Sequence, residues 1–210
     1  MNRPGKIVCV GRNYVEHAAE LGNKVPTIPL LFFKPPSAVI TDGAEIVLPS
    51  ASQKVEHEGE IGVVIGKYLR MVGEDEAVDG VKGVTCVNDV TARDLQKSDG
   101  QWTRAKGFDT FCPMGPRLVL REELPALNEL SVICRVNGVE RQSGNASDMA
   151  FSIPYIISYV SHIMTLEPGD LVSTGTPAGV GPLMPGDVVE VEIPGVGVLT
   201  NPVVAGASSD

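Results

Sequence analysis

The most informative stretch of the chain reads Glu56-His57-Glu58-Gly59-Glu60 and continues as Ile61-Gly62-Val63-Val64-Ile65-Gly66. Its second half is short, apolar, β-branched and bounded by glycines, which predicts a buried strand. Side chains alternate between the faces of a strand, so Glu58 and Glu60 are expected to project on the same side. Two carboxylates that close repel each other, and a proton, a cationic side chain or a metal ion must offset the repulsion. The alternative is that both acids are solvated at the end of a strand.

Length and composition predict one domain spanning residues 1–210. The chain has 210 residues, of which 43% are hydrophobic and 20% charged, with 23 glycines and 16 prolines. Such a composition is typical of a globular protein rich in strands and turns. Residues 201–210 are expected to form a loose tail. The net charge of -9 should repel phosphate backbones and anionic lipid, so nucleic acid is not expected as a partner.

The cysteines indicate a reducing compartment. Cys9, Cys86, Cys112 and Cys134 are widely spaced and form no C-x-x-C pair, so we expect buried, reduced thiols. No apolar stretch approaches membrane-spanning length, and Lys6–Val10 is too short for the core of a signal peptide. We therefore expect a cytoplasmic protein with no membrane partner.

A candidate general base lies near the start of the chain. After a predicted strand at residues 6–11, residues 12–22 read as a short helix that Asn13 caps and Gly22 closes. On this helix His17 and Glu20 are three residues apart and share a face. A carboxylate beside an imidazole raises its basicity and fixes its tautomer. The alternative is an ion pair on a helix surface.

The middle of the chain contributes a third acid and a lysine. Asp89 follows a predicted strand at residues 83–87, where it either reaches a site at the edge of the sheet or caps a helix. Lys106 lies in a loop beside a glycine and aromatic residues, and partial desolvation there would favour an anionic partner.

The second half of the chain reads as β-rich. Asn137-Gly138 predicts a hairpin between strands at residues 130–136 and 139–142. Ser152 opens a predicted helix with one apolar stripe, and His162 falls off that stripe. The loop at residues 174–181 carries hydroxyls and backbone amides that can hold a small carboxylate, although it lacks the lysine and helix of a P-loop.

Together, Glu58, Glu60 and Asp89 would offer hard oxygen ligands to Mg²⁺, which prefers about six oxygens. Three carboxylates against one divalent ion leave about one negative charge, which suits a chelating, enolisable substrate better than free phosphate. Lys106, Arg93 and the amides of residues 174–176 would then balance a substrate carboxylate.

Several motifs in order resemble the fumarylacetoacetate hydrolase family, in its short single-domain form close to acylpyruvate hydrolases and oxaloacetate decarboxylases. The resemblance runs from about Lys6 to Leu199 and rests on Gly11-Arg12-Asn13-Tyr14 with His17 and Glu20, Phe33-Lys34-Pro35, His57-Glu58-Gly59-Glu60, Asn88-Asp89 with Arg93-Asp94 and Gln96, Lys106-Gly107-Phe108-Asp109, and Gly175-Thr176-Pro177. Gly59 replaces the bulkier residue that often separates the two glutamates. We expect this change to alter packing and to leave metal ligation intact.

The resemblance implies an α+β fold, a mixed folded β-sheet roll with short helices, usually assembled as a homodimer. It implies Mg²⁺, or Mn²⁺ or Ca²⁺ in its place, held by Glu58, Glu60 and Asp89. It also implies that the His17–Glu20 helix is a lid that orders over substrate. The assigned catalytic residues are His17, Glu20 and Lys106, and the assigned substrate-binding residues are Arg12, Tyr14, Lys34, Arg93, Gln96, Thr174, Gly175 and Thr176.

The expected function is metal-dependent C–C bond hydrolysis of acylpyruvate-type 2,4-dioxo acids to pyruvate and a carboxylic acid. Two alternatives use the same metal half of the site: decarboxylation of oxaloacetate, and isomerisation or tautomerisation of hydroxymuconate-type dioic acids in aromatic catabolism. Outside the enzymes, the chain could be an inactive, metal-stabilised binding module. That alternative predicts a decayed site, yet all of the assigned metal ligands and the His17–Glu20 pair are present.

Overall fold

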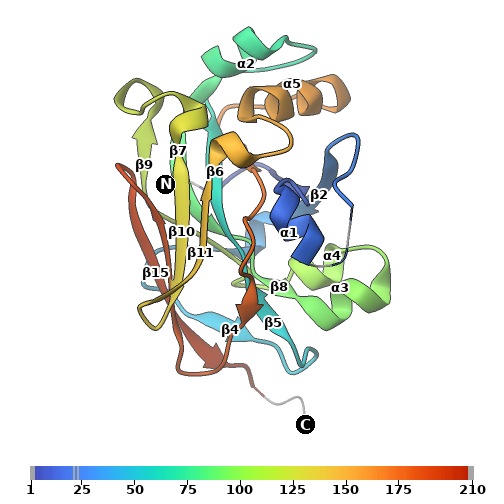
Figure 1. Cartoon of the computed structure of the whole chain (residues 1–210), viewed down its shortest axis with the longest axis vertical. Coiled ribbons are helices and arrows are strands. Elements are labelled where there is room, and N and C mark those ends of the chain that lie inside the picture. The colour runs from blue at the N-terminus through green and yellow to red at the C-terminus, as the bar shows by residue number, and fades with distance from the viewer. Residues whose placement is uncertain (1–2, 21, 23, 208–210) are drawn as a thin grey trace.

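Curved sheets bordered by short helices make up the protein in a computed structural model that describes residues 3–20, 22 and 24–207 (Figure 1). The predicted α+β class is confirmed. Within the described residues, the main sheet has the order β2 (Leu30–Lys34), β1 (Ile7–Gly11), β12 (Leu171–Ser173), β6 (Gly59–Ile65), β7 (Val81–Asn88), β9 (Cys112–Leu120) and β3 (Val39–Ile40). It is mixed, because β1 pairs with β12 in parallel and β12 pairs with β6 antiparallel.

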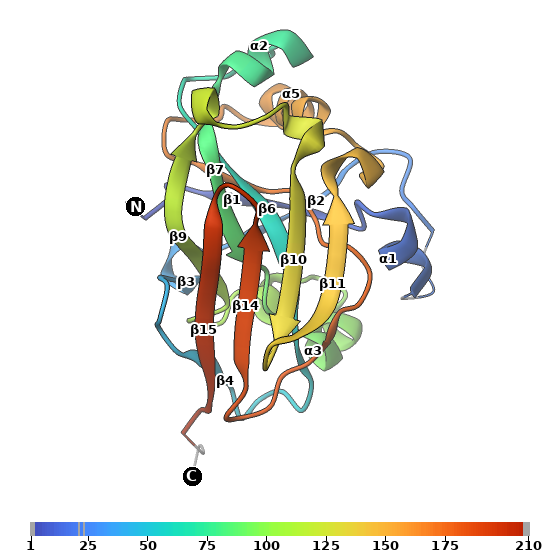
Figure 2. The same ribbon diagram turned by 60° about the vertical axis from the view of Figure 1, so that its left-hand side comes forward.

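A second sheet covers one face of the main sheet (Figure 2). Its order is β11 (Val139–Asn145), β10 (Ser131–Val136), β14 (Val188–Ile193), β15 (Gly197–Ala205) and β4 (Ile46–Leu48). The predicted hairpin at Asn137-Gly138 is confirmed, and both turn residues have the positive φ that this turn requires. A small third sheet joins β13 (Gly181–Pro182), β5 (Val55–His57) and β8 (Thr91–Ala92).

The start of β6 packs closely against the second sheet. A Cβ on Gly59 would lie 2.9 Å from Cβ of Cys134 in the second sheet. The position therefore excludes any larger residue unless the sheets move apart. Every residue of β6 is buried, as its apolar pattern predicts. The four cysteines are buried free thiols, as expected.

The helices lie outside the sheets. The helices α1 (Val15–Glu20), α3 (Arg93–Asp99) and α4 (Thr103–Lys106) lie on one side of the main sheet, and α2 (Glu74–Asp79) packs with α5 (Ile153–Ile163) at one end (Figure 1). Ser152 caps α5 as predicted, because its side chain accepts a hydrogen bond from the amide of Tyr155. Among the described residues, no helix is long and apolar enough to cross a membrane.

Two local predictions are wrong. Asn13 does not cap α1, because its amide donates to the carbonyls of Phe151 and Thr174 and accepts from the amide of Phe151. It ties together three segments that are distant in sequence. The expected tail is a strand as far as Ala205, because Val203 to Ala205 pair in parallel with Ile46 to Leu48. Residues 208–210 of that tail lie outside the described residues.

Candidate active site

Three buried carboxylates meet at the ends of neighbouring strands. Glu58 lies in the break between β5 and β6, Glu60 lies in β6, and Asp89 directly follows β7. Because Gly59 pairs with Asn88, the start of β6 and the end of β7 are adjacent. Candidate ligand atoms of the three residues all lie within 4.8 Å of one another. The sequence placed the two glutamates on one strand; the structure interrupts that strand at Glu58 and still brings both carboxylates together.

Cationic side chains surround this acidic cluster, which we define as Glu58, Glu60 and Asp89. The ammonium of Lys106 donates to Oε2 of Glu58 at 2.8 Å and to Oδ2 of Asp89 at 2.6 Å. Lys34 donates to the other oxygen of Asp89 at 2.6 Å, and Arg93 donates to Oε1 of Glu58. Lysines and arginines are rarely this buried unless paired, so these contacts account for their positions.

The two glutamates differ in their electrostatic environment. Burial alone would raise the pKa of Glu58, but Lys106 and Arg93 hold that pKa well below its usual range. Burial raises the pKa of Glu60 to about 8, and the charges of Asp89 and Glu58 add to the effect. In the described part of the chain, Glu60 forms no ion pair; it accepts hydrogen bonds from the hydroxyl of Ser173 and the amide of Gly175. The acidic cluster therefore lacks compensating positive charge at Glu60.

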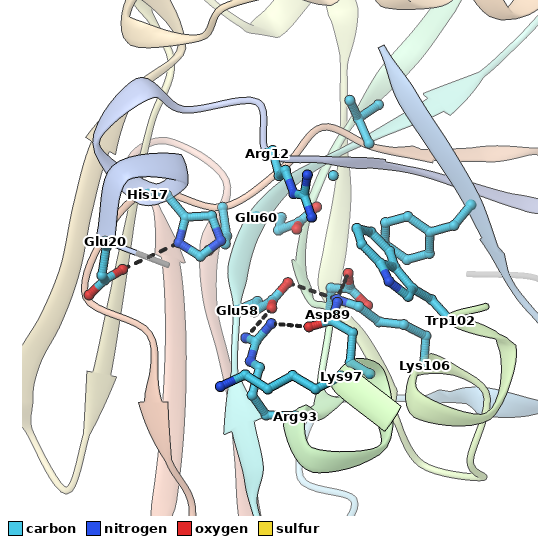
Figure 3. A pocket seen from close by; sticks show the side chains of 15 residues that line it. Arg12, His17, Glu20, Glu58, Glu60, Asp89, Arg93, Lys97, Trp102 and Lys106 are labelled. Atoms are coloured by element: carbon cyan, nitrogen blue, oxygen red, sulfur yellow. Dashed lines mark hydrogen bonds and ion pairs between the residues drawn. The ribbon is translucent and has the colours of Figure 1, made fainter. Parts of the chain in front are cut away.

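The His17–Glu20 pair faces this cluster from α1 (Figure 3). Nδ1 of His17 lies 3.3 Å from Oε2 of Glu20, and the other ring nitrogen is turned toward the acidic cluster. His17 is buried, which is unlike a surface ion pair on a helix. Glu20 is held in turn by the backbone amide of Gly179, at 3.1 and 3.2 Å from its two oxygens.

A cavity of about 470 Å³ contains both halves of the site. The lining includes most of the predicted site residues: Arg12, His17, Glu20, Glu58, Glu60, Asp89, Arg93, Gln96, Lys106 and Thr176. Residues far apart in sequence thus meet in one cavity of the size that small-molecule sites have.

The other predicted substrate-binding residues do not line this cavity. Lys34 is buried against Asp89 and the carbonyl of Val90. The hydroxyl of Thr174 donates to the carbonyl of Ile61, and the amide of Gly175 is used by Glu60. Tyr14 is buried, and its hydroxyl has no hydrogen-bond partner in the described part of the protein. In this structure, Lys34 and Gly175 therefore bind members of the acidic cluster, and Thr174 binds the backbone of β6.

Five residues that line the cavity were not predicted as site residues: Val10, Gly11, Phe32, Lys97 and Trp102. Lys97 follows Arg93 by four residues on α3, and that helical spacing could have placed it on the same face. Trp102 packs edge to face on Phe32, and the guanidinium of Arg12 lies 5.9 Å from its ring centre. Arg12 adopts a positive φ of 58°, a conformation that is uncommon for residues other than glycine.

A buried acidic cluster and a histidine–glutamate pair that line one cavity are typical of an enzyme active site. The acidic cluster contains residues that could hold a metal ion. The chain belongs to the fumarylacetoacetate hydrolase family: residues 6–204 match the family described as "Fumarylacetoacetate (FAA) hydrolase C-terminal". The resemblance noted in the sequence is thereby confirmed.

Similar proteins with named activities act on small oxo or hydroxy acids. The human protein named "Oxaloacetate tautomerase FAHD1, mitochondrial" is 46% identical over 92% of this chain and 89% of its own length. The Dictyostelium discoideum protein named "Oxaloacetate decarboxylase, mitochondrial" is 44% identical over 91% of this chain and 89% of its own length. The crystal structure of a 2-hydroxyhepta-2,4-diene-1,7-dioate isomerase from Mycobacterium marinum superimposes with a TM-score of 0.89 at 45% identity, covering 98% of this chain and 77% of that chain.

Proposed function

We propose that this protein is a divalent-metal-dependent enzyme that moves a proton at carbon 3 of dianionic 2-oxo acids, of which oxaloacetate is the simplest. One observation carries the proposal: the acidic cluster and the His17–Glu20 pair line the same cavity. The printed names of the human and Dictyostelium relatives, a tautomerase and a decarboxylase of oxaloacetate, support the same substrate class.

The acidic cluster fits a hard divalent cation such as Mg²⁺. Its members offer carboxylate oxygens, which Mg²⁺ prefers, and their candidate ligand atoms lie within 4.8 Å of one another. The raised pKa of Glu60 indicates positive charge still to be supplied. Glu58, Glu60 and Asp89 would hold the ion, and a bound ion would stabilise negative charge that develops on the 2-oxo oxygen of the substrate.

The charge of the cavity suits a dianion. Its lining contains equal numbers of basic and acidic side chains: Arg12, Arg93, Lys97 and Lys106 against Glu20, Glu58, Glu60 and Asp89. A divalent cation would leave an excess of two positive charges, which a dicarboxylate neutralises. The negative excess inferred from sequence counted only the three carboxylates and the ion. Including the basic residues and Glu20 of the lining reverses its sign.

His17 is positioned to transfer the proton. If Nδ1–H donates to Glu20, the other ring nitrogen is left as a proton acceptor on the cavity side. It would take a proton from carbon 3 and return it to the 2-oxo oxygen, which gives the enol form without any change in composition. Lys106 stays protonated, because Asp89 and Glu58 raise its pKa against the effect of burial, and it can hold a substrate oxygen by charge.

Product analysis tests this function. Purified protein would be given oxaloacetate with Mg²⁺ and again with excess chelator, while enol formation and CO₂ release are followed. We expect chelator-sensitive turnover that His17→Ala lowers by about 10²–10⁴-fold, whereas His162→Ala, at an exposed histidine on α5, leaves the rate unchanged. Full activity of His17→Ala would exclude the assigned base, and release of CO₂ in place of the enol would identify a decarboxylase.

Acylpyruvate hydrolysis is the second candidate, and the His17–Glu20 pair favours it because the same imidazole could deprotonate an attacking water. Acetylpyruvate carries one carboxylate, so it would neutralise only one of the two excess positive charges that the cavity would have with a divalent cation bound. A parallel assay with acetylpyruvate distinguishes the two, since hydrolysis releases pyruvate and acetate. Failure to turn over either acid or a longer dioic acid would favour an inactive binding module.

A further inference from the structure

One polar side chain on the second sheet is buried where an exposed one is expected. β11 is an edge strand, and within it only Gln142 is buried, with 2% of its surface exposed. The pairing with β10 shifts register here: Cys134 pairs with Gln142, and Arg135 pairs with Glu140, so Arg141 is an extra residue. β-Bulges of this kind bend a strand and redirect a side chain, and they are over-represented next to active sites.

The Gln142 amide makes four hydrogen bonds. Its Oε1 accepts from the amide of Gly59 and from Nδ1 of His57, both at 3.0 Å. Its Nε2 donates to Oγ1 of Thr176 and to the carbonyl of Pro177, both at 2.7 Å. The backbone amide only donates and the backbone carbonyl only accepts, so the orientation of the amide is fixed.

These partners belong to the two halves of the site. Gly59 is the residue between Glu58 and Glu60, and the hydroxyl of Thr176 closes the connection by donating to the Gly59 carbonyl at 2.9 Å. Because its one proton is used there, this hydroxyl cannot donate to substrate in this arrangement. Pro177 lies two residues before Gly179, whose amide holds Glu20.

The backbone of β11 contacts Gly179 as well. A Cβ on Gly179 would lie 1.9 Å from the carbonyl oxygen of Arg141, and Gly179 has a φ of +100°. The bulge therefore places the Arg141 carbonyl against Gly179 and the Gln142 side chain against Pro177. The bulge in β11 therefore supports the loop that holds Glu20.

We propose that Gln142 is a positioning residue that fixes the metal-binding half of the site relative to the half that carries His17 and Glu20. The proposal rests on the proposed function for its effect on turnover. Through Gly59 the amide holds the chain between Glu58 and Glu60; through Pro177 it holds the loop that orients Glu20 and thus His17. Gln142 does not line the cavity itself.

The variant Gln142→Glu separates the two connections. A carboxylate of the same size still accepts hydrogen bonds from Gly59 and His57, but it has no N–H to donate to the Pro177 carbonyl. The matched control is Ser143→Asp, which adds the same charge at the next, exposed residue of β11. Gln142→Asn is the second variant: it is neutral and too short to reach both sides, so it keeps the test available if Gln142→Glu does not fold.

Three measurements follow: hydrogen exchange of the α1 amides, Mn²⁺ affinity by electron paramagnetic resonance, and kcat and KM for oxaloacetate at saturating Mg²⁺. In Gln142→Glu we expect α1 amides to exchange at least about tenfold faster and kcat to fall by about 10–100-fold with KM nearly unchanged. The Mn²⁺ Kd should change by less than about tenfold, because a larger change is expected only when the ligands themselves are disturbed. Gln142→Asn should show the same pattern to a smaller extent, and Ser143→Asp should match the wild type.

Two results would overturn the proposal. Unchanged α1 exchange and unchanged kcat in Gln142→Glu would show that the amide positions nothing. Equal loosening of α1 and β6, with loss of Mn²⁺ binding, would show a general structural role. If the wild type turns over no 2-oxo acid, the proposed function fails, and α1 exchange together with Mn²⁺ affinity still decides the role of Gln142.

Discussion

At the scale of single residues, Glu60 differs from Glu58 and Asp89 because no cationic side chain of the described residues pairs with it. Its pKa is raised to about 8 by burial and by Asp89 and Glu58, from a usual value near 4.5. The folded, metal-free protein therefore binds more protons than the unfolded chain between these pH values. Its stability is highest below pH 4.5 with respect to this group, and it falls as the pH rises toward 8.

The variant Glu60→Gln tests this linkage. We expect metal-free Glu60→Gln to be more stable than the metal-free wild type at pH 8.5 by about 1 kcal/mol or more, with little difference at pH 5. Urea denaturation in excess chelator measures both values. The control is Glu129→Gln, which removes an exposed acid and should keep the pH dependence of the wild type. If the stability of Glu60→Gln depended on pH as that of the wild type does, the raised pKa would not belong to Glu60.

Lys34 and Lys106 both neutralise Asp89, but only Lys106 lines the cavity. Replacing either by Met leaves a buried carboxylate less compensated, and we expect each to cost about 3–5 kcal/mol in the metal-free protein. Lys34→Met should raise the Mg²⁺ concentration needed for activity by about 10–100-fold, and its kcat should return to the wild-type value at saturating Mg²⁺. The kcat of Lys106→Met should stay low at saturating Mg²⁺. Mg²⁺ titrations of kcat distinguish the pair, and equal recovery of both would remove Lys106 from the site.

The sequence predicts the chemistry of these residues better than their connections. Glu58, Glu60, Asp89 and His17 stand out because acids beside an apolar strand, and an acid near a histidine on one helix, need an explanation. Gln142 does not stand out, because its hydrogen-bond partners lie 83 to 85 residues before it and 34 to 35 residues after it. Lys34 could be read as facing the site or solvent, since only tertiary contacts place it behind Asp89.

At the scale of elements, the position of α1 depends on the loop after β12. Gly179 holds Glu20 through its amide, and its positive φ and contact with the Arg141 carbonyl exclude a side chain. Gly179→Ala should displace the loop and lower kcat about as much as Glu20→Gln does, by about 10²-fold. Gly138→Ala is the matched control: that residue also has a positive φ but nothing within 4 Å of an added Cβ.

We expect Gly138→Ala to lose about 1 kcal/mol of stability and no activity. Steady-state kinetics and urea denaturation of both variants give the comparison. Equal activity of the two alanine variants would show that Gly179 does not set the position of Glu20.

Elements that are defined by local pattern are predictable from this sequence, and elements that are defined by distant pairing are not. The hairpin at Asn137-Gly138 and the capped helix α5 match their predictions because turn and capping residues act locally. The end of β15 was expected to be a tail because nothing near it indicates its parallel partner β4, which lies about 150 residues earlier in the chain. The break between β5 and β6 at Glu58 was missed for the same reason, since β5 pairs with β8 and β13, outside the main sheet.

At the scale of the whole molecule, the net charge of -9 contrasts with a cavity in which basic and acidic side chains balance. The field of the whole protein attracts a divalent cation and repels a dianion. We therefore expect the cation to bind first, and its affinity to depend on ionic strength. Raising KCl from about 20 to 200 mM shortens the screening length from about 20 to 7 Å and should weaken Mg²⁺ binding severalfold.

The double variant Glu122→Lys/Glu123→Lys separates this long-range effect from local contacts. Both glutamates are exposed in the turn after β9, and neither lines the cavity. The two substitutions replace two negative charges by two positive ones. They should weaken Mg²⁺ binding at low salt and leave it unchanged at high salt, because only the screened, long-range attraction differs. Calorimetric Mg²⁺ titrations at both salt concentrations give the four dissociation constants. An equal loss of Mg²⁺ affinity at high and low salt would mean that the substitutions act through the structure of the site. If the Mg²⁺ affinity of the wild type did not depend on salt, long-range attraction would not contribute, and only the acidic cluster itself would determine the electrostatics of metal binding.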